Sequence, residues 1–161
     1  NVDTRLRKVA SGEFDGVILG AAALIRLGWE ERISEYLPLE HFLPAVGQGA
    51  LVIEARRDEE MAGLVSPINH LPTWQSITAE RAFLRALGGG CHHPIAALGT
   101  VNGTTLRLEG MVANVSRREI LRMAEEGRPS SPEELGVRLA QRMLGMGASA
   151  FIAEARDCED G

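Results

Sequence analysis

Apolar positions follow different periods in the two halves of the chain. Residues 14–21 (FDGVILGA) and 50–56 (ALVIEAR) are short, branched apolar runs, which is typical of buried strands in a parallel sheet. Helical spacing flanks the first run, over residues 1–10 and 22–29, and glycines predict where these helices end. This order of helix, strand and helix predicts an α/β piece with a parallel or mixed sheet.

The second half alternates apolar and polar residues with a period of two. Such runs occupy residues 95–101, 104–114 and 118–127, and they predict a small antiparallel three-stranded sheet. Helical patterns follow the sheet and precede it, so we expect an α+β domain with helices on one face. The helical runs are residues 78–88, 130–148 and 149–156. Two prolines within residues 66–74 mark the expected boundary between the halves.

Composition narrows the class of protein. The 161 residues are 45% hydrophobic but only 4% aromatic, so an aliphatic core is expected. A net charge of −5 argues against nucleic acid as the main partner. No apolar run approaches the roughly 18–20 residues of a membrane span, which argues against a membrane partner. Cys91 and Cys158 lie far apart, which argues against a disulfide framework and favours the cytoplasm.

Cys91 stands in the segment LGGGCHHPIAALG, where several kinds of chemistry are open. A metal site with His92 and His93 is disfavoured, because zinc ligands are usually spaced by two or more residues. A redox thiol would need a resolving cysteine nearby. A small buried thiol beside a turn is the commonest role of a lone cysteine. The glycine run, however, lets a ligand approach the backbone, as a nucleophile would need. The residues alone leave the last two roles open.

Basic residues supply a second candidate site. Arg5, Arg7 and Lys8 cluster near the start of the chain, and Arg26 follows the apolar run 14–21. Ligands of α/β sheets bind at strand ends, where an arginine suits carboxylates because its guanidinium can bind both oxygens. We interpret Arg7 and Lys8 as solvated residues of a helix face.

Four segments together resemble the porphobilinogen deaminase family, also called hydroxymethylbilane synthases. They are NVDTRL, FDGVILGAAALIRLG, LPAVGQGALVIEAR and TAERAFLRALGGGCHHPIAALG, and they follow one another in the family order. The combination of LPAVGQGA, a downstream ER and GGCxxP is highly specific. The resemblance implies that Cys91 carries a dipyrromethane cofactor through a thioether bond. It also implies a transferase of tetrapyrrole biosynthesis, which joins four porphobilinogen molecules in turn and releases hydroxymethylbilane.

The resemblance implies roles for further residues. The growing pyrrole chain is a polyanion, and Arg5 and Arg26 match positions that handle its acetate and propionate groups. Arg81 matches an interdomain contact, and His92 and His93 fall at variable positions between the cysteine and the proline. The matches to cleft or hinge positions are Asn1, Gly20, Gln48 and Gly49.

The resemblance also implies an organisation. The family has three domains, the first two resembling type II periplasmic binding proteins. Residues 1–44 then form the later part of domain two, residues 45–71 cross back to domain one, and residues 72–161 form domain three. The catalytic aspartate of the family lies outside this chain, so we interpret the chain as a fragment that is inactive alone. We also expect exposed strand edges in residues 1–70 to let the fragment self-associate. The full-length enzyme is expected to be a cytoplasmic monomer without a metal. The alternative is a noncatalytic ligand-binding or interaction module of the same fold.

Overall fold

The computed structural model describes residues 1–56, 58–88, 93–114 and 116–157. The chain divides into two compact units, Asn1–Phe42 and Leu43–Gly161, which are called unit 1 and unit 2 below. Each unit is described by itself. The assignment of residues to family domains stays a prediction.

Unit 1 consists of short helices joined by turns. Helix α1 spans Val2–Ala10, α2 spans Ala21–Arg26, and a 3-10 turn, η1, spans Glu30–Arg32. Gly12 and Gly28 follow the two α-helices with φ values of +76° and +71°, a conformation that glycine adopts without strain. The prediction of a strand over residues 14–21 is wrong for this structure, because no strand forms among the described residues of unit 1. A buried parallel strand requires neighbouring strands on its edges, and the run has none here.

Unit 2 begins with a largely irregular segment. A short helix, α3 (Glu59–Val65), begins where the Asp58 carboxylate accepts a hydrogen bond from the Met61 N–H at 2.8 Å, and the 3-10 turn η2 (Ser66–Ile68) follows it. The prediction of a second strand, over residues 50–56, is also wrong. These residues form no strand, and the side chain of Leu51 in this run is 84% exposed. The reason is again the lack of a neighbouring strand in the described chain.

The predicted antiparallel sheet is confirmed. Strand β1 spans Ile95–Asn102, β2 spans Thr105–Asn114 and β3 spans Glu119–Gly127. The order is β1-β2-β3, and both pairs are antiparallel. Leu108 lies opposite Gly99 on one side and Glu125 on the other, and the even-numbered residues of β2 from 106 to 114 are buried.

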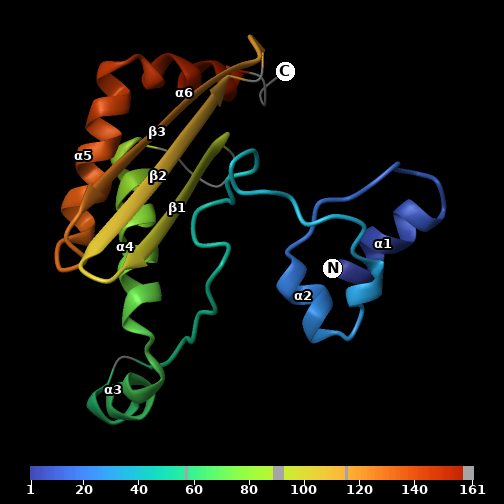
Figure 1. Ribbon diagram of the computed structural model, residues 1–161, viewed down its shortest axis with the longest axis horizontal. Helices are drawn as coiled ribbons and strands as arrows, with labels where there is room; N and C mark the ends of the chain where they lie inside the picture. Colours follow the sequence, from blue (N-terminus) through green and yellow to red (C-terminus); the bar gives the residue numbers. More distant parts are fainter. Residues whose placement is uncertain (57, 89–92, 115, 158–161) are drawn as a thin grey trace. The chain divides into compact units, whose positions relative to one another are not determined.

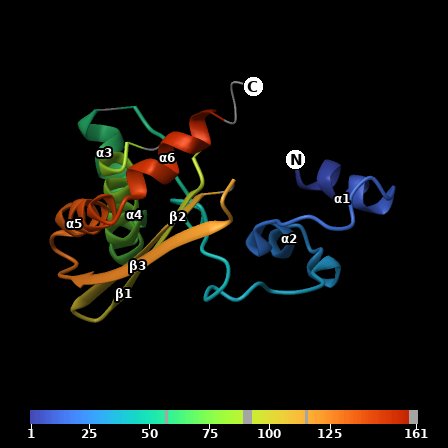
Figure 2. The ribbon, with the colours of Figure 1, turned by 90° about the horizontal axis from the view of Figure 1, so that it is seen from above.

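Three helices cover one face of this sheet, as expected (Figure 1; Figure 2). They are α4 (Leu71–Ala86), α5 (Pro132–Gly145) and α6 (Ala148–Asp157). Helix α4 begins seven residues before the predicted start at residue 78, because Pro72 is tolerated in a first helical turn. The largest fully buried side chains are mainly aliphatic, in keeping with the composition: Phe83, Leu106, Leu108, Leu135, Leu139, Met143 and Val112.

Two glycines allow the closest contacts of this core. A Cβ atom on Gly136 of α5 would lie 2.7 Å from Ala82 Cβ and 2.8 Å from Phe83 N, and closer still to the Ala79 carbonyl oxygen of α4. A Cβ on Gly110 of β2 would lie 2.5 Å from Cζ of the Phe83 ring. Helix α4 therefore packs this closely against both the sheet and α5 only because both positions lack a side chain.

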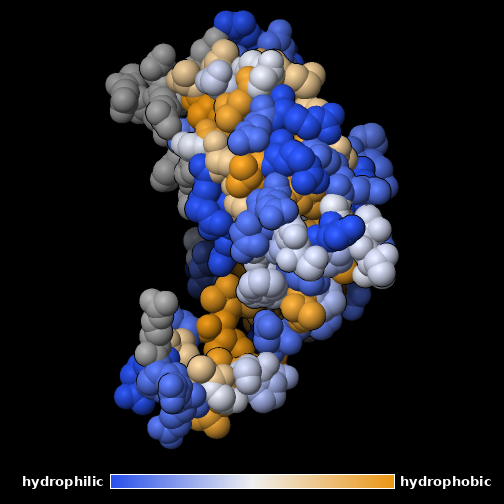
Figure 3. All heavy atoms as spheres, turned by 90° about the vertical axis from the view of Figure 1, so that its left-hand side faces the viewer, coloured by the Kyte–Doolittle hydropathy of each residue, from blue (hydrophilic) through white to orange (hydrophobic). Residues whose placement is uncertain are grey.

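The surface of unit 2 is mixed. Figure 3 shows the side on which α5 lies, where hydrophilic residues cover much of the face and hydrophobic residues gather toward α3. Exposed hydrophobic residues of α3 and the beginning of α4 include Leu64, Leu71 and Trp74. Among the described residues, none of the helices combines the length and the apolar character needed to cross a membrane.

Candidate functional site

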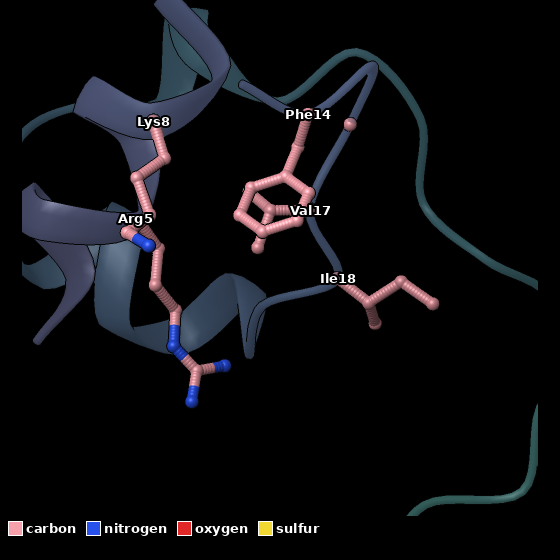
Figure 4. A pocket seen from close by; sticks show the side chains of 6 residues that line it. Arg5, Lys8, Phe14, Val17 and Ile18 are labelled. Atoms are coloured by element: carbon pink, nitrogen blue, oxygen red, sulfur yellow. The ribbon is translucent and has the colours of Figure 1, made fainter.

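An open hollow of about 550 Å³ in unit 1 contains one of the predicted arginines. Its lining residues come from α1 and from the segment after it: Arg5, Lys8, Phe14, Gly16, Val17 and Ile18. Figure 4 shows Arg5 and Lys8 on one side of the hollow and Phe14 and Val17 opposite them. Arg5 and Lys8 share a helix face because they are three residues apart. The site therefore combines a cationic side with an apolar wall.

The two cations of the hollow differ in their partners. Lys8 Nζ lies 2.7 Å from Glu13 Oε1 and 5.3 Å from the centre of the Phe14 ring, so much of its charge is already compensated. Among the described residues, no acidic side chain forms an ion pair with Arg5. Arg5 is exposed, and its guanidinium can donate hydrogen bonds to a carboxylate. The interpretation of Lys8 as a solvated helix residue was therefore only partly right.

The remaining predicted residues of unit 1 lie outside the lining of this hollow. Gly20 is the exposed residue before α2, with φ −69° and ψ 116°, and Arg26 is the exposed last residue of that helix. Asn1 is the exposed residue before α1. The structure does not bring Arg26 into the hollow that contains Arg5, so a joint role stays a prediction.

Gln48 and Gly49 belong to unit 2, where they stand at the end of a defined turn. Gln48 N donates to Ala45 O at 3.0 Å, and Gly47, the third residue of that turn, has φ +77°. A positive φ at this position is the mark of a type II turn and favours glycine. Gln48 closes this turn, Gly49 follows it, and both residues are exposed. Their part in ligand binding stays a prediction.

The cysteine loop lies at the edge of the described chain. Cys91 and His92 fall outside the described residues, as does Cys158, and their predicted roles stay predictions. His93 is half-buried just before β1, and Arg81 is exposed on α4. Within the ranges that the structure describes, no three histidine, cysteine or acidic residues come close enough to hold a metal ion.

Sequence reasoning missed Glu80, a residue that organises the turn before Gln48. Its side chain is buried on α4, with only 3% of its surface exposed. It accepts hydrogen bonds from Gly47 N and from Gly99 N, each at 2.8 Å. Burial raises the pKa of Glu80, and the two backbone donors and the nearby Arg81 oppose that rise only in part. The signal in the sequence was an acidic residue on the apolar face of a helix.

Comparison with known proteins identifies the family. The family model described as "Porphobilinogen deaminase, dipyromethane cofactor binding domain" matches residues 1–63, and the model of the porphobilinogen deaminase C-terminal domain matches residues 74–145. The two models follow one another along the chain. The chain belongs to the porphobilinogen deaminase family. Arg5 and its hollow lie in the part matched by the cofactor-binding domain, whereas Cys91 lies in the part matched by the C-terminal domain.

Curated relatives agree with this assignment. The chain is 40% identical over 158 residues to the porphobilinogen deaminase of Syntrophus aciditrophicus, covering 98% of this chain and 52% of the relative. Identity to the porphobilinogen deaminase of Alkaliphilus metalliredigens is 46% over 153 residues, covering 94% and 48%. Identity to that of Desulforudis audaxviator is 46% over 157 residues, covering 97% and 51%. The chain therefore spans about half the length of the porphobilinogen deaminases that it matches.

The residues of unit 1 fit the cofactor that the family domain is named for. A dipyrromethane unit carries carboxylates on two flat pyrrole rings that a methylene group joins. The hollow offers the exposed Arg5 guanidinium for a carboxylate and the Phe14 and Val17 side chains for a ring. Arg5, Phe14 and Val17 therefore suit a carboxylated pyrrole better than a neutral polar ligand.

Proposed function

We propose that this chain is the C-terminal portion of a hydroxymethylbilane synthase, which condenses four porphobilinogen molecules into hydroxymethylbilane with release of ammonia. The observation that carries the proposal is the consecutive match of both porphobilinogen deaminase domains along the chain. The cationic and apolar hollow of unit 1 supports it, because the substrate has the same chemistry as the cofactor. We place the enzyme in the cytoplasm as a monomer.

The chain's own residues would then have separate tasks. Cys91 is the attachment point of the dipyrromethane, since a thiolate is a strong nucleophile toward carbon. When bound, this group supplies the pyrrole carbon to which the substrate units are joined. Arg5 and Arg26 bind the carboxylates of the chain, and Gly20, Gln48 and Gly49 line the cleft. A charged donor that binds both carboxylate oxygens orients each pyrrole as well as holding it.

The proposal includes the domain arrangement. Residues 1–44 belong to the second α/β domain, residues 45–71 return to the first, and residues 72–161 form the third. In the complete enzyme, the apolar runs 14–21 and 50–56 pair with strands of sheets resembling those of periplasmic binding proteins. The high exposure of Leu51, Val52 and Ile53 supports this pairing, because such side chains are usually buried.

A hybrid enzyme tests the proposal directly. This chain would replace the matching half of the Desulforudis audaxviator relative, to which it is 46% identical. Two measurements are made on the purified hybrid: the formation of hydroxymethylbilane from porphobilinogen, and the intact mass, which reveals a covalent dipyrromethane. We expect both product and adduct. The isolated 161-residue chain is expected to give no product.

Two cysteine variants form a matched pair. Cys91→Ser keeps the size of the side chain but offers a weaker nucleophile, so the hybrid is expected to lose the adduct and nearly all turnover. Cys158→Ser is expected to keep both. An adduct that survives Cys91→Ser and disappears with Cys158→Ser would reverse the assignment. A folded hybrid that has neither adduct nor turnover would support a noncatalytic binding module instead.

A further inference from the structure

The Glu80 carboxylate joins two segments that are distant in sequence. Oε2 accepts from the backbone N–H of Gly47, 33 residues earlier, and Oε1 accepts from that of Gly99, 19 residues later, each at 2.8 Å. The carboxylate is almost fully buried. An ionised carboxylate is costly to bury unless hydrogen bonds compensate it, so both donors are needed to hold the charge.

Close packing of β1 on α4 makes the bond to Gly99 possible. A Cβ atom on Gly99 would lie 2.8 Å from the carbonyl oxygen and 2.9 Å from the Cα of Ser76. Ser76 is one helical turn before Glu80 and therefore lies on the same face of α4. Glycine at this position lets the edge of β1 approach the helix until its N–H reaches the carboxylate.

The segment before Gln48 is held at two points. Pro44 O accepts from the Ala97 N–H of β1 at 3.2 Å, and Glu80 holds the Gly47 N–H. Ala97 and Gly99 are alternate residues of an edge strand, so their N–H groups point to the same edge. Residues 44–47 are thereby aligned along β1, and the chain leaves this support at Gln48.

We propose that Glu80 is a positioning residue that fixes the Gly47 turn and, through it, places Gln48 and Gly49 in the substrate cleft. This inference rests on the proposed function, since the cleft is that of the synthase. A carboxylate is required because both of its oxygens accept hydrogen bonds. A glutamine would face one of the two backbone N–H donors with its own NH2 group, so one bond would be lost.

The two hydrogen bonds of Glu80, to Gly47 and to Gly99, are called the anchor below. Amide hydrogen exchange of this chain, resolved by residue with NMR, tests the anchor without a measurement of enzyme activity. Gly47 is expected to exchange slowly although it lies outside any helix or strand, whereas Gly49, for which no bonded acceptor is described, exchanges fast. In Glu80→Gln, exchange at Gly47 or Gly99 should accelerate about tenfold, the factor for losing one hydrogen bond to a charged group. The control Glu134→Gln, at an exposed position of α5, should change neither. Equal exchange at Gly47 and Gly49 in the unsubstituted chain would overturn the anchor.

Kinetics of the hybrid then test the positioning role. Turnover is expressed per adduct-bearing molecule, counted by intact mass, so that loss of folded protein does not enter. We expect Glu80→Gln to raise KM for porphobilinogen or to lower kcat about tenfold. We expect Glu80→Asp, which keeps the carboxylate on a shorter side chain, to recover part of the loss. Unchanged KM and kcat in Glu80→Gln would reduce Glu80 to a structural role and overturn the proposal. A hybrid that is inactive with Glu80 intact would refute the proposed function, and the role of the turn within it, while the exchange result still reports on the anchor.

Discussion

Gly136→Ala should destabilise unit 2 although alanine is the better helix former. The new Cβ would meet backbone atoms of α4, which cannot move aside as a flexible side chain would. Overpacking of this kind costs about 3 kcal/mol, at the upper end of the usual range. The gain in helix propensity returns about 1 kcal/mol. The free energy of unfolding should therefore fall by about 2 kcal/mol, which lowers the melting temperature by about 10 °C for a domain of this size.

Tryptophan fluorescence can isolate the unfolding of unit 2. The chain has two tryptophans, and in a Trp29→Phe background the remaining Trp74 reports on α4. Gly145→Ala is the matched control, because Gly145 is also in α5 and a Cβ there would meet nothing within 4 Å. This control should leave the melting temperature unchanged or raise it slightly. If Gly136→Ala melts at or above the temperature of Gly145→Ala, the close contact between α4 and α5 is not present.

Acid should weaken unit 2 through Glu109 and Glu125. Burial alone raises their pKa, but hydrogen bonds from arginine partners outweigh it and leave the pKa of both carboxyls below normal. Their contribution to the free energy of unfolding is therefore present at neutral pH and is lost as the pH falls through those lowered pKa values. Urea unfolding measured over a pH series should show a smaller loss of stability in acid for Glu109→Gln than for the unsubstituted chain. An equal loss in the two proteins would contradict the pairing of Glu109 with its arginines. In the hybrid enzyme, Arg5→Leu should raise KM for porphobilinogen about tenfold. Arg7→Leu should not, because Arg7 pairs with Asp3 at 3.1 Å and does not line the hollow; equal effects of the two would argue against binding there.

The antiparallel part of the fold was predictable because its information is local. Strands β1, β2 and β3 follow one another with short connections, so period-two alternation determines both the strands and their pairing. The helix expected over residues 130–148 was confirmed as well, as α5 begins at Pro132 and ends at Gly145. Each of these elements finds its partner within a few tens of residues.

In the first half of the chain, the sequence pattern did not predict the strands correctly. The runs 14–21 and 50–56 have the composition of buried strands, yet neither forms one here. A strand is completed by the backbone groups of its neighbours, and composition cannot say whether those neighbours are present.

The residues of the candidate site also differ in how far the sequence could identify them. Arg5 was predicted from its place in a basic cluster and from the resemblance to the family, and it lines the hollow. Lys8 lies three residues later on the same helix face, and this spacing could have included it. The sequence marks Glu80 only as an acidic residue on the apolar face of a helix. Its two partners could not be predicted, because they are backbone N–H groups, which leave no signature in residue types.

The edge of β1 that faces away from β2 already has hydrogen-bond partners, and this limits how the sheet can change over evolution. The outward N–H groups of Ala97 and Gly99 already have acceptors in Pro44 and Glu80. An added strand could not pair there without displacing the crossing segment. Among the edges that the structure describes, growth by insertion, tagging or strand exchange is therefore directed to β3. Lineages that enlarge this domain should place their extra strands on that side, and a peptide designed to extend the sheet should be built against residues 119–127.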